Sequence, residues 1–159
     1  MIKIDLSNVI SSVVEDFNSD LSNSNKNINI NIDHSKLNGS KMNVLGVESK
    51  LEQIVANLLE NAVSFSPPNS QIYVMCSVNK KNTKLVIEDE GPGFNEKNIN
   101  KVFERFDSNR PEKFGQHSGL GLNIVKNIIE LHGGAIIASN RSNSSKSGAR
   151  IEVLLPIYK

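Results

Sequence analysis

No stretch of the chain reaches the roughly 18 consecutive apolar residues that a membrane-spanning helix needs. The opening residues, MIKIDLSNVI, also lack the layout of a secretory signal peptide. Lysine and arginine number 18 against 17 acidic residues, which leaves a net charge of +1 and no polybasic stripe of the kind that binds nucleic acid. We therefore expect a soluble chain with no nucleic-acid partner, although it can be a piece of a membrane protein.

Cysteine is limited to Cys76, which stands in the apolar run YVMCSV. That run predicts a strand, so we expect a buried, reduced thiol and a cytoplasmic location. Hydrophobic residues make up 38% of the 159 residues and charged residues 22%. This composition is typical of one globular domain that is large enough to build a real core.

The spacing of apolar residues predicts three longer helices and about five strands. The helices cover residues 6–17, with Ser7 as the N-cap, 49–65 and 120–131, and a shorter helix lies near 96–102. The strands cover residues 28–32, 71–78, 84–89, 135–139 and 149–156. Because most strands follow one another through hairpins, we expect an α+β fold. Its form is a two-layer α/β sandwich, with three helices packed against a mixed, mostly antiparallel sheet of about five strands.

The helix at 49–65 carries a polar stripe that consists of Gln53, Asn57, Glu60, Asn61 and Ser64. Asparagine is a poor helix former because its amide competes for backbone hydrogen bonds, so two of them one turn apart in mid-helix call for a reason. One interpretation is a solvated face in an asparagine-rich protein. The other is a cation site, where amide oxygens and water hold a Mg²⁺ that substrate phosphates mainly ligate.

Glycines follow a predicted strand in the segment IEDEGPGF and precede the last helix in the segment HSGLGLNIV. Asp89 ends the strand, where its carboxylate can accept a hydrogen bond from an exocyclic amine, and Gly91 and Gly93 let a flat base approach the backbone. The alternative is an ordinary acidic turn. Gly119 and Gly121 either cradle a phosphate with bare N–H groups at the positive end of the helix, or form a flexible loop.

In their order and spacing these motifs resemble the catalytic, ATP-binding domain of sensor histidine kinases, within the superfamily shared with DNA gyrase, Hsp90 and MutL. LEQIVANLLENAVSFSP is similar to the N box, DEGPG to the first glycine box and VFERF to the F box. SGLGLNIVKNIIELHGG is similar to the second glycine box, and SGARIEVLLP to the closing strand. The resemblance covers nearly the whole chain. It implies a single Bergerat-type domain over residues 1–159, with ATP and Mg²⁺ as cofactors.

The resemblance also implies a role for each matching residue. Asn57, Asn61 and Arg110 form the expected catalytic set, in which Asn61 coordinates Mg²⁺ and Asn57 lies on the phosphate side. Asp89 is expected to accept the adenine amine, and residues 107–118 to form a lid over ATP, anchored by Phe103 and Phe106. The other expected nucleotide contacts are Phe65, Gly91, Gly93, Phe106, His117, Ser118, Gly119, Leu120 and Gly121.

Three positions depart from the family pattern. Ser64 stands where the N box usually carries a lysine, Ser108 stands where a basic residue often follows the F box, and His117 replaces the first glycine of the second box. The two lost cations normally counter phosphate charge, which is the main work in phosphoryl transfer. Arg105, Arg110 or Lys113 can supply the charge from the lid instead.

One branch of the family shares these features. The segments NAVSFSPP and NRPEKFGQHSGLGL together resemble the alphaproteobacterial ChvG-type kinases, in which similar departures occur. This resemblance implies that the missing lysine is a trait of the lineage.

None of the three histidines stands in the His-acidic context of a phosphoacceptor. His34 is expected at the surface, His117 in the lid, and His132 in a structural role at a helix end. We therefore expect the phosphoacceptor hairpin to be absent. The implied partners are a histidine-bearing dimerisation and phosphotransfer domain and, indirectly, a response regulator. The parent protein is expected to be membrane-anchored and the fragment monomeric.

Three other functions stay open. An anti-sigma-factor serine kinase has a similar size and fold, and Glu60 is a candidate for its catalytic base, but the F box argues against it. An ATP-driven clamp of the gyrase or MutL kind would need a transducer domain. A pseudo-enzyme would bind nucleotide, or only a partner, without transferring phosphate, and the departures at Ser64 and Ser108 keep that alternative in play.

Overall fold

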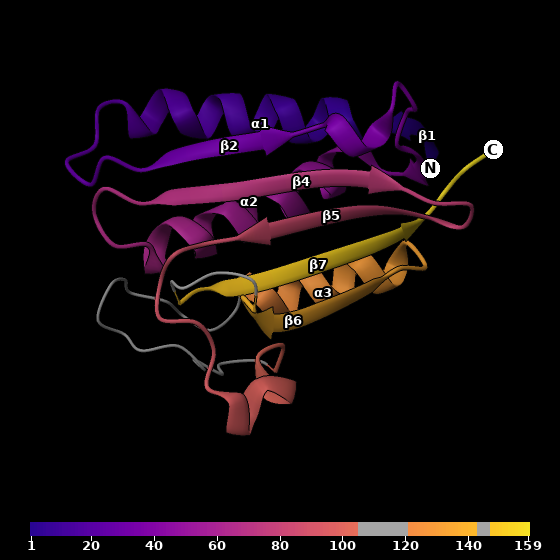
Figure 1. The fold of residues 1–159 in the computed structure, drawn as a ribbon. Coiled ribbons are helices and arrows are strands. Elements are labelled where there is room, and N and C mark those ends of the chain that lie inside the picture. Colours follow the sequence, from indigo (N-terminus) through magenta and orange to yellow (C-terminus); the bar gives the residue numbers. More distant parts are fainter. Residues whose placement is uncertain (105–120, 143–146) are drawn as a thin grey trace.

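A computed structural model describes residues 1–104, 121–142 and 147–159, apart from the side chains of residues 96, 98 and 100. Its elements follow in the order β1 (Ile2–Asp5), α1 (Leu6–Leu21), β2 (Asn29–Asp33), η1 (Ser35–Leu37), β3 (Asn43–Gly46), α2 (Glu48–Phe65), β4 (Gln71–Val78), β5 (Asn82–Glu88), η2 (Glu96–Lys101), α3 (Gly121–Leu131), β6 (Ala135–Asn140) and β7 (Ala149–Pro156). The large sheet forms one layer and the three α-helices form the other (Figure 1).

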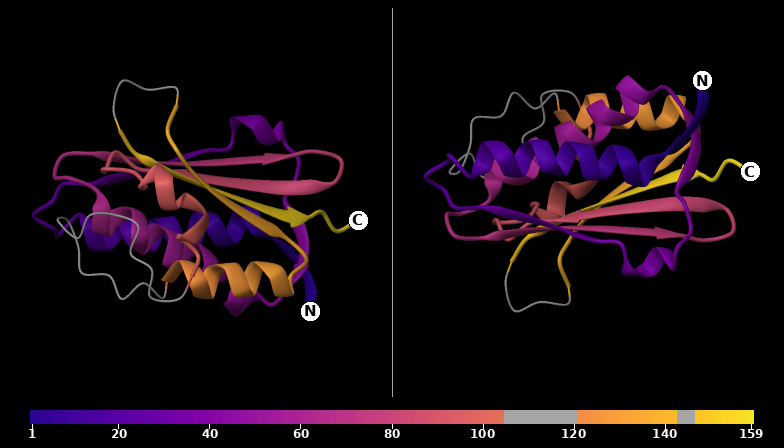
Figure 2. Two further views of the ribbon diagram at one scale, coloured as in Figure 1. Left: turned by 90° about the horizontal axis from the view of Figure 1, so that it is seen from below. Right: turned by 90° about the horizontal axis from the view of Figure 1, so that it is seen from above.

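The large sheet has five strands in the order β2-β4-β5-β7-β6. β2 runs parallel to β4, and the three other strand pairs are antiparallel. All three α-helices cover the same face of the sheet (Figure 2). The expected two-layer sandwich with a mixed, mostly antiparallel sheet is therefore confirmed.

The core lies between the helices and the sheet. Strand residues alternate between the two faces, so Ile72, Val74 and Cys76 of β4 are buried beneath the helices. α2 is the central helix, since it packs against α1 on one side and α3 on the other. Its apolar face is almost completely buried, and each such Leu or Ile contributes roughly 1.5–3 kcal/mol. This packing fixes the polar stripe of α2 relative to the sheet.

The start of α1 differs from the prediction. Asp5 is the N-cap, and its Oδ1 accepts hydrogen bonds from the Ser7 backbone N–H (3.1 Å) and the Ser7 hydroxyl (2.6 Å). The expectation that Ser7 is the N-cap was therefore wrong. β1 and β3 form a two-stranded antiparallel sheet, which the periodicity did not predict, and α1 begins directly after β1. The Met42 N–H also donates to Asp5 Oδ1 (3.1 Å), which ties the cap to the segment before β3.

Two expectations drawn from absences can be compared with the structure. Among the described helices, none combines the length and the apolar character needed to cross a membrane. Cys76 is buried in β4 and is free, as expected. Burial, helped by the negative charges of Asp33 and Asp5, raises the pKa of its thiol to about 11.

Candidate functional site

The polar stripe of α2 divides into a buried and an exposed part. Asn61 is only 4% exposed and Asn57 and Ser64 are half-buried, whereas Glu60 is exposed. A solvated face therefore describes Glu60 but does not describe Asn61. An amide that leaves water must find polar partners, so a buried Asn in mid-helix is costly unless its site uses it. The helix that carries the stripe, α2, packs against α3 and also contacts β5.

Asp89 comes directly after β5 and is fixed by the neighbouring backbone. The residue is 2% exposed, and its Oδ1 accepts hydrogen bonds from the N–H groups of Gly91 (2.9 Å) and Ala149 (3.2 Å). The Asp89 N–H donates in turn to the Ala149 carbonyl (3.1 Å). The carboxylate is therefore buried as an acceptor whose orientation is set by the turn that follows it and by the start of β7. An ordinary acidic turn, exposed to water, does not describe this geometry.

The glycines after Asp89 pack tightly between strands. Gly93 has φ = +78°, a conformation that residues with a side chain rarely adopt, and a Cβ there would lie 2.7 Å from Asn140 Oδ1. The Gly91 carbonyl accepts a hydrogen bond from the Ser147 hydroxyl (2.8 Å). The first glycine box is therefore held by residues at the ends of β6 and β7.

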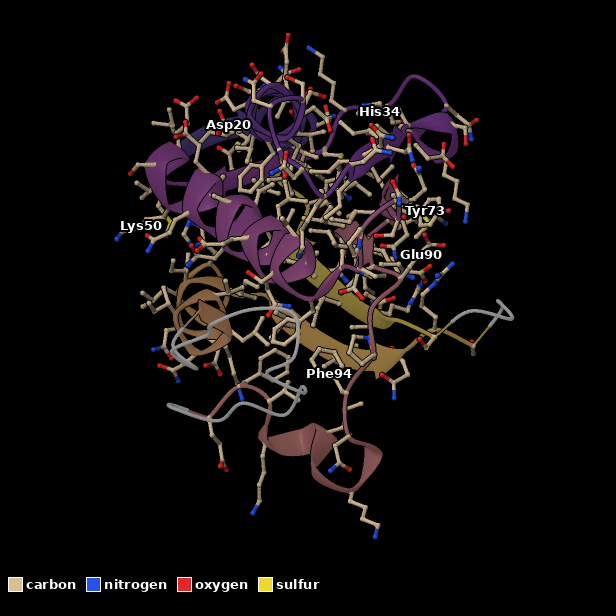
Figure 3. All side chains as sticks on the ribbon, turned by 90° about the vertical axis from the view of Figure 1, so that its left-hand side faces the viewer. Asp20, His34, Lys50, Tyr73, Glu90 and Phe94 are labelled. Atoms are coloured by element: carbon tan, nitrogen blue, oxygen red, sulfur yellow. The ribbon has the colours of Figure 1, made fainter. Side chains whose placement is uncertain are left out.

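Aromatic residues border the same end of the molecule. Phe65, the last residue of α2, is 2% exposed, and Phe94, at the end of the glycine turn, is 5% exposed. The Phe103 carbonyl accepts a hydrogen bond from Asn123 Nδ2 (3.1 Å), and Lys126 Nζ lies 5.7 Å from the centre of the Phe103 ring. Two residues of α3 thus hold the beginning of the F box. Figure 3 shows this end, with Phe94 between the sheet and η2.

Several of the predicted site residues cannot be compared with the structure. Phe106, Arg110, His117, Ser118, Gly119, Leu120 and the whole predicted lid at 107–118 lie outside the described residues. Gly121 is the first residue of α3. The described part of the chain therefore contains the N box, the first glycine box and the helix that follows the second one.

Two of the histidines lie where the sequence predicted. His34 is exposed. His132 follows α3, where its Nδ1 lies 2.8 Å from the Ile128 carbonyl and its Nε2 accepts a hydrogen bond from the Val47 N–H (3.3 Å). Because Val47 N–H can only donate, the ring uses the tautomer protonated at Nδ1. His132 therefore has a structural role, joining the end of α3 to the residue before α2.

Sequence reasoning missed four residues around this site. Asn140, Arg141 and Ser147 contact the glycine turn, and Lys26 Nζ donates to the Val63 carbonyl (3.1 Å) near the end of α2. Burial lowers the pKa of the Lys26 ammonium. In a chain so rich in asparagine, Asn140 gave no signal of its own, and Lys26 stands in a polar segment that reads as an exposed loop.

Comparisons with known proteins agree with this geometry. The sequence profile of the histidine kinase-, DNA gyrase B- and HSP90-like ATPases matches residues 46–159. The sensor protein ChvG of Rhizobium meliloti is 43% identical over 118 residues, which are 71% of this chain and 20% of that protein. The chain thus spans about a fifth of the length of the curated relative it matches. This similarity confirms the resemblance to the ChvG-type branch.

Solved structures give the same result. A mycobacterial sensor histidine kinase, MprB, has a TM-score of 0.80 and 30% identity, with 97% of each chain covered. The nucleotide-free catalytic domain of the histidine kinase ThkA has a TM-score of 0.77 over 97% of this chain and 95% of that one, and at 23% identity it is alike in fold. The chain therefore belongs to the family of histidine kinase-, DNA gyrase B- and HSP90-like ATPases, as the ATP-binding domain typical of sensor histidine kinases.

Proposed function

We propose that the chain binds Mg²⁺–ATP and transfers the γ-phosphate to a histidine on a separate dimerisation and phosphotransfer domain. One observation carries this proposal: in a member of an ATPase family, Asp89 is a buried acceptor at a strand end, oriented by two backbone N–H groups and followed by a tight glycine turn. A carboxylate has about four acceptor sites, so an aspartate that backbone N–H groups orient is able to accept the adenine amine as well.

The base would lie against the turn of Gly91 and Gly93, with Phe65 as its aromatic neighbour. The phosphates would point toward α2 and the start of α3, where Gly121 opens the helix and the positive end of its dipole favours an anion. The predicted contacts of Phe106, His117, Ser118, Gly119 and Leu120 belong to the same proposal, as does closure of the lid at 107–118.

The residues of α2 fit a magnesium ion that arrives with its nucleotide. Among the described residues, no group of three or more His, Cys, Asp or Glu side chains is placed to hold a metal by itself. Mg²⁺ is usually bound through one or two protein oxygens, water and substrate phosphates, and the amide oxygen of Asn61, with Asn57 one turn earlier, provides such a ligand. Bound there, the ion would neutralise phosphate charge.

The transfer step needs no general base in this chain, because a neutral imidazole is already a nucleophile. Catalysis would consist of holding the phosphates in line and countering their charge, with Asn57, Asn61 and Arg110 as the catalytic set. In this proposal the whole of 1–159 is one domain of a two-component sensor kinase. The kinase is anchored in the membrane with this domain on the cytoplasmic side, and it passes phosphate on to a response regulator.

Calorimetric titration of Mg²⁺–ATP into the wild type and Asp89→Asn tests nucleotide recognition. A hydrogen bond to a charged group is worth about 1.5–3 kcal/mol, so we expect the mutant to bind roughly 10- to 150-fold more weakly. Asp33→Asn is the matched control, because Asp33 also ends a strand but is exposed, and it should bind as the wild type does. A folded wild type that does not bind Mg²⁺–ATP would refute the proposal.

Phosphotransfer needs a second experiment. The histidine-bearing domain of the parent kinase is supplied in trans, and incorporation of the labelled γ-phosphate is followed with wild type and Asn61→Ala. We expect labelling with the wild type and its loss with the variant. Binding of Mg²⁺–ATP without any labelling would support the nucleotide-binding pseudo-enzyme, for which the serine at position 64 already provides an argument.

A further inference from the structure

Asn140 and Arg141, consecutive residues at the end of β6, contact the segment around Asp89 from opposite faces of the sheet. Asn140 pairs in register with Ala149, the residue that is hydrogen-bonded to Asp89. Successive side chains of a strand point to opposite faces, so Asn140 lies on the helix-covered face and Arg141 on the outer face. β6 is the edge strand and is separated from β5 by β7, yet its last residues reach across to the turn that follows β5.

Asn140 contacts the turn as a neighbouring strand would. Its Oδ1 accepts a hydrogen bond from the Phe94 N–H (2.6 Å), and its Nδ2 donates to the Phe94 carbonyl (3.0 Å). One side chain therefore satisfies both backbone groups of Phe94, at the point where the glycine turn ends. Gly93 makes this approach possible, since any side chain there would collide with the Asn140 amide.

Arg141 holds the residues on either side of Asp89. Its Nε lies 3.3 Å from Glu88 Oε1 and its Nη1 lies 3.9 Å from Glu90 Oε2. The Arg141 side chain is 11% exposed and its guanidinium carbon lies 5.4 Å from the centre of the Tyr73 ring. In Figure 3, Tyr73 and Glu90 lie together on the face of the sheet away from the helices. Ion pairs as buried as these are screened much less than surface pairs.

We infer that Asn140 and Arg141 are positioning residues, which hold the Asp89–Phe94 segment in the conformation that recognises adenine. The inference rests on the proposed function and adds two residues that act through the turn. Asn140 fixes the end of the glycine turn from inside, and Arg141 fixes the two carboxylates flanking Asp89 from outside. Loss of either contact leaves the Asp89 carboxylate and the glycine backbone held only by their remaining hydrogen bonds, so the base is bound less well.

A purely structural role would produce a different result, and the chain contains a matched control for it. Asn18 makes the same two-bond contact with Ile30 of β2, since its Nδ2 donates to the Ile30 carbonyl (3.1 Å) and its Oδ1 accepts from the Ile30 N–H (3.1 Å). β2 is the opposite edge of the sheet. Asn18→Ala therefore removes the same kind of contact at a site with no proposed part in binding.

The experiment measures dissociation constants of Mg²⁺–ATP, Mg²⁺–ADP and adenosine well below the unfolding temperature, which circular dichroism establishes for each variant. Two hydrogen bonds are lost in Asn140→Ala, and we expect roughly tenfold weaker binding. The factor should be the same for all three ligands, because the turn contacts the base they share. Asn18→Ala should bind all three as the wild type does. Arg141→Met should also weaken binding of each ligand, and Arg141→Lys, which keeps the charge, should restore part of the affinity.

Wild-type affinity in folded Asn140→Ala and Arg141→Met would overturn the inference, as would an equal loss in Asn18→Ala. A loss confined to ATP and ADP would overturn it too, since the effect would then lie at the phosphates. If Asn140→Ala does not fold, the two Arg141 variants still test the inference, through the contact on the outer face of the sheet. A wild type that binds none of the ligands would instead refute the proposed function itself.

Discussion

The backbone of Gly148 packs directly against the carbonyl oxygen of Asp89: a Cβ on Gly148 would lie 1.9 Å from that oxygen. The optimal separation of non-bonded heavy atoms is about 3.5 Å or more, so no side chain fits at this position unless the strand end moves. The Gly148 carbonyl also accepts a hydrogen bond from the Arg141 N–H (3.0 Å). Gly148, just before β7, therefore packs between the backbone of Asp89 and the end of β6.

Gly148→Ala should accordingly impair both stability and binding. We expect the free energy of unfolding to fall by about 1–3 kcal/mol, as overpacking usually costs, and Mg²⁺–ATP binding to be lost, because the displaced residue is Asp89. Urea denaturation and calorimetric titration measure the two effects. Gly39→Ala is the control: Gly39 has φ = +80° with open space around it, so it should cost roughly 1 kcal/mol without changing affinity. A Gly148→Ala protein that binds normally would contradict this account of the contact.

The sequence predicted the elements that local periodicity determines. The apolar spacing of α2 and the alternation in β4 are visible within one segment, and both lie within a residue of the predicted bounds. The pair β1–β3 was missed because four-residue strands carry little pattern and their pairing joins Ile2 to Gly46 across a long interval. The N-cap was misplaced for the same reason, since the end of β1 decides where the helix begins.

The candidate site shows the same division. Asp89 and the glycines stand together in one short segment, and a strand-ending carboxylate before two glycines has a chemical meaning by itself. Asn140 and Arg141 gain a role only through the sheet order β5-β7-β6, which brings the end of β6 close to the end of β5. No local pattern contains that information, so residues that hold a site from a distance are the part that sequence reasoning misses.

The corrected N-cap leads to a second prediction. Asp5→Ala removes the acceptor shared by two backbone N–H groups, those of Ser7 and Met42, and should lower the free energy of unfolding by about 1–2 kcal/mol. Ser7→Ala removes only a hydroxyl donor and should cost less than about 0.5 kcal/mol. Chemical denaturation of both variants shows whether Asp5 or Ser7 caps the helix. A larger loss in Ser7→Ala than in Asp5→Ala would restore Ser7 as the capping residue.

A third prediction concerns the reactivity of Cys76. Burial, with smaller effects from Asp33 and Asp5, raises the pKa of its thiol to about 11. The thiolate is the reactive form, so at about pH 8 only about one thiol in a thousand is ionised, and the reaction rate should still rise with pH beyond pH 9. A chromogenic disulfide reagent should therefore react very slowly with the native protein and quickly in 8 M urea, a control that exposes the same thiol, where the pKa returns to roughly 8.5. Rapid labelling of the folded protein would show that β4 opens or that the thiol is accessible.

The last prediction concerns the serine that replaces the usual N-box lysine. Ser64 lies on α2 three residues after Asn61 and is half-buried, and the nearby Lys26 ammonium is engaged with the Val63 carbonyl. Ser64→Lys should add a positive charge on the phosphate side of α2 and strengthen Mg²⁺–ATP binding by about three- to tenfold. The gain should shrink as salt is added, because salt screens the attraction between the lysine and the phosphates. Titration with ATP and with adenosine measures it, and adenosine should gain nothing.

Ser64→Met is the matched control, because it adds a side chain of similar length without charge. If Met strengthens binding as much as Lys does, the gain comes from packing and not from the phosphates. If neither variant strengthens binding, another cation already neutralises the phosphates in this lineage. Arg110 is then the residue to change next, because its substitution should lower the affinity for ATP while leaving adenosine binding intact.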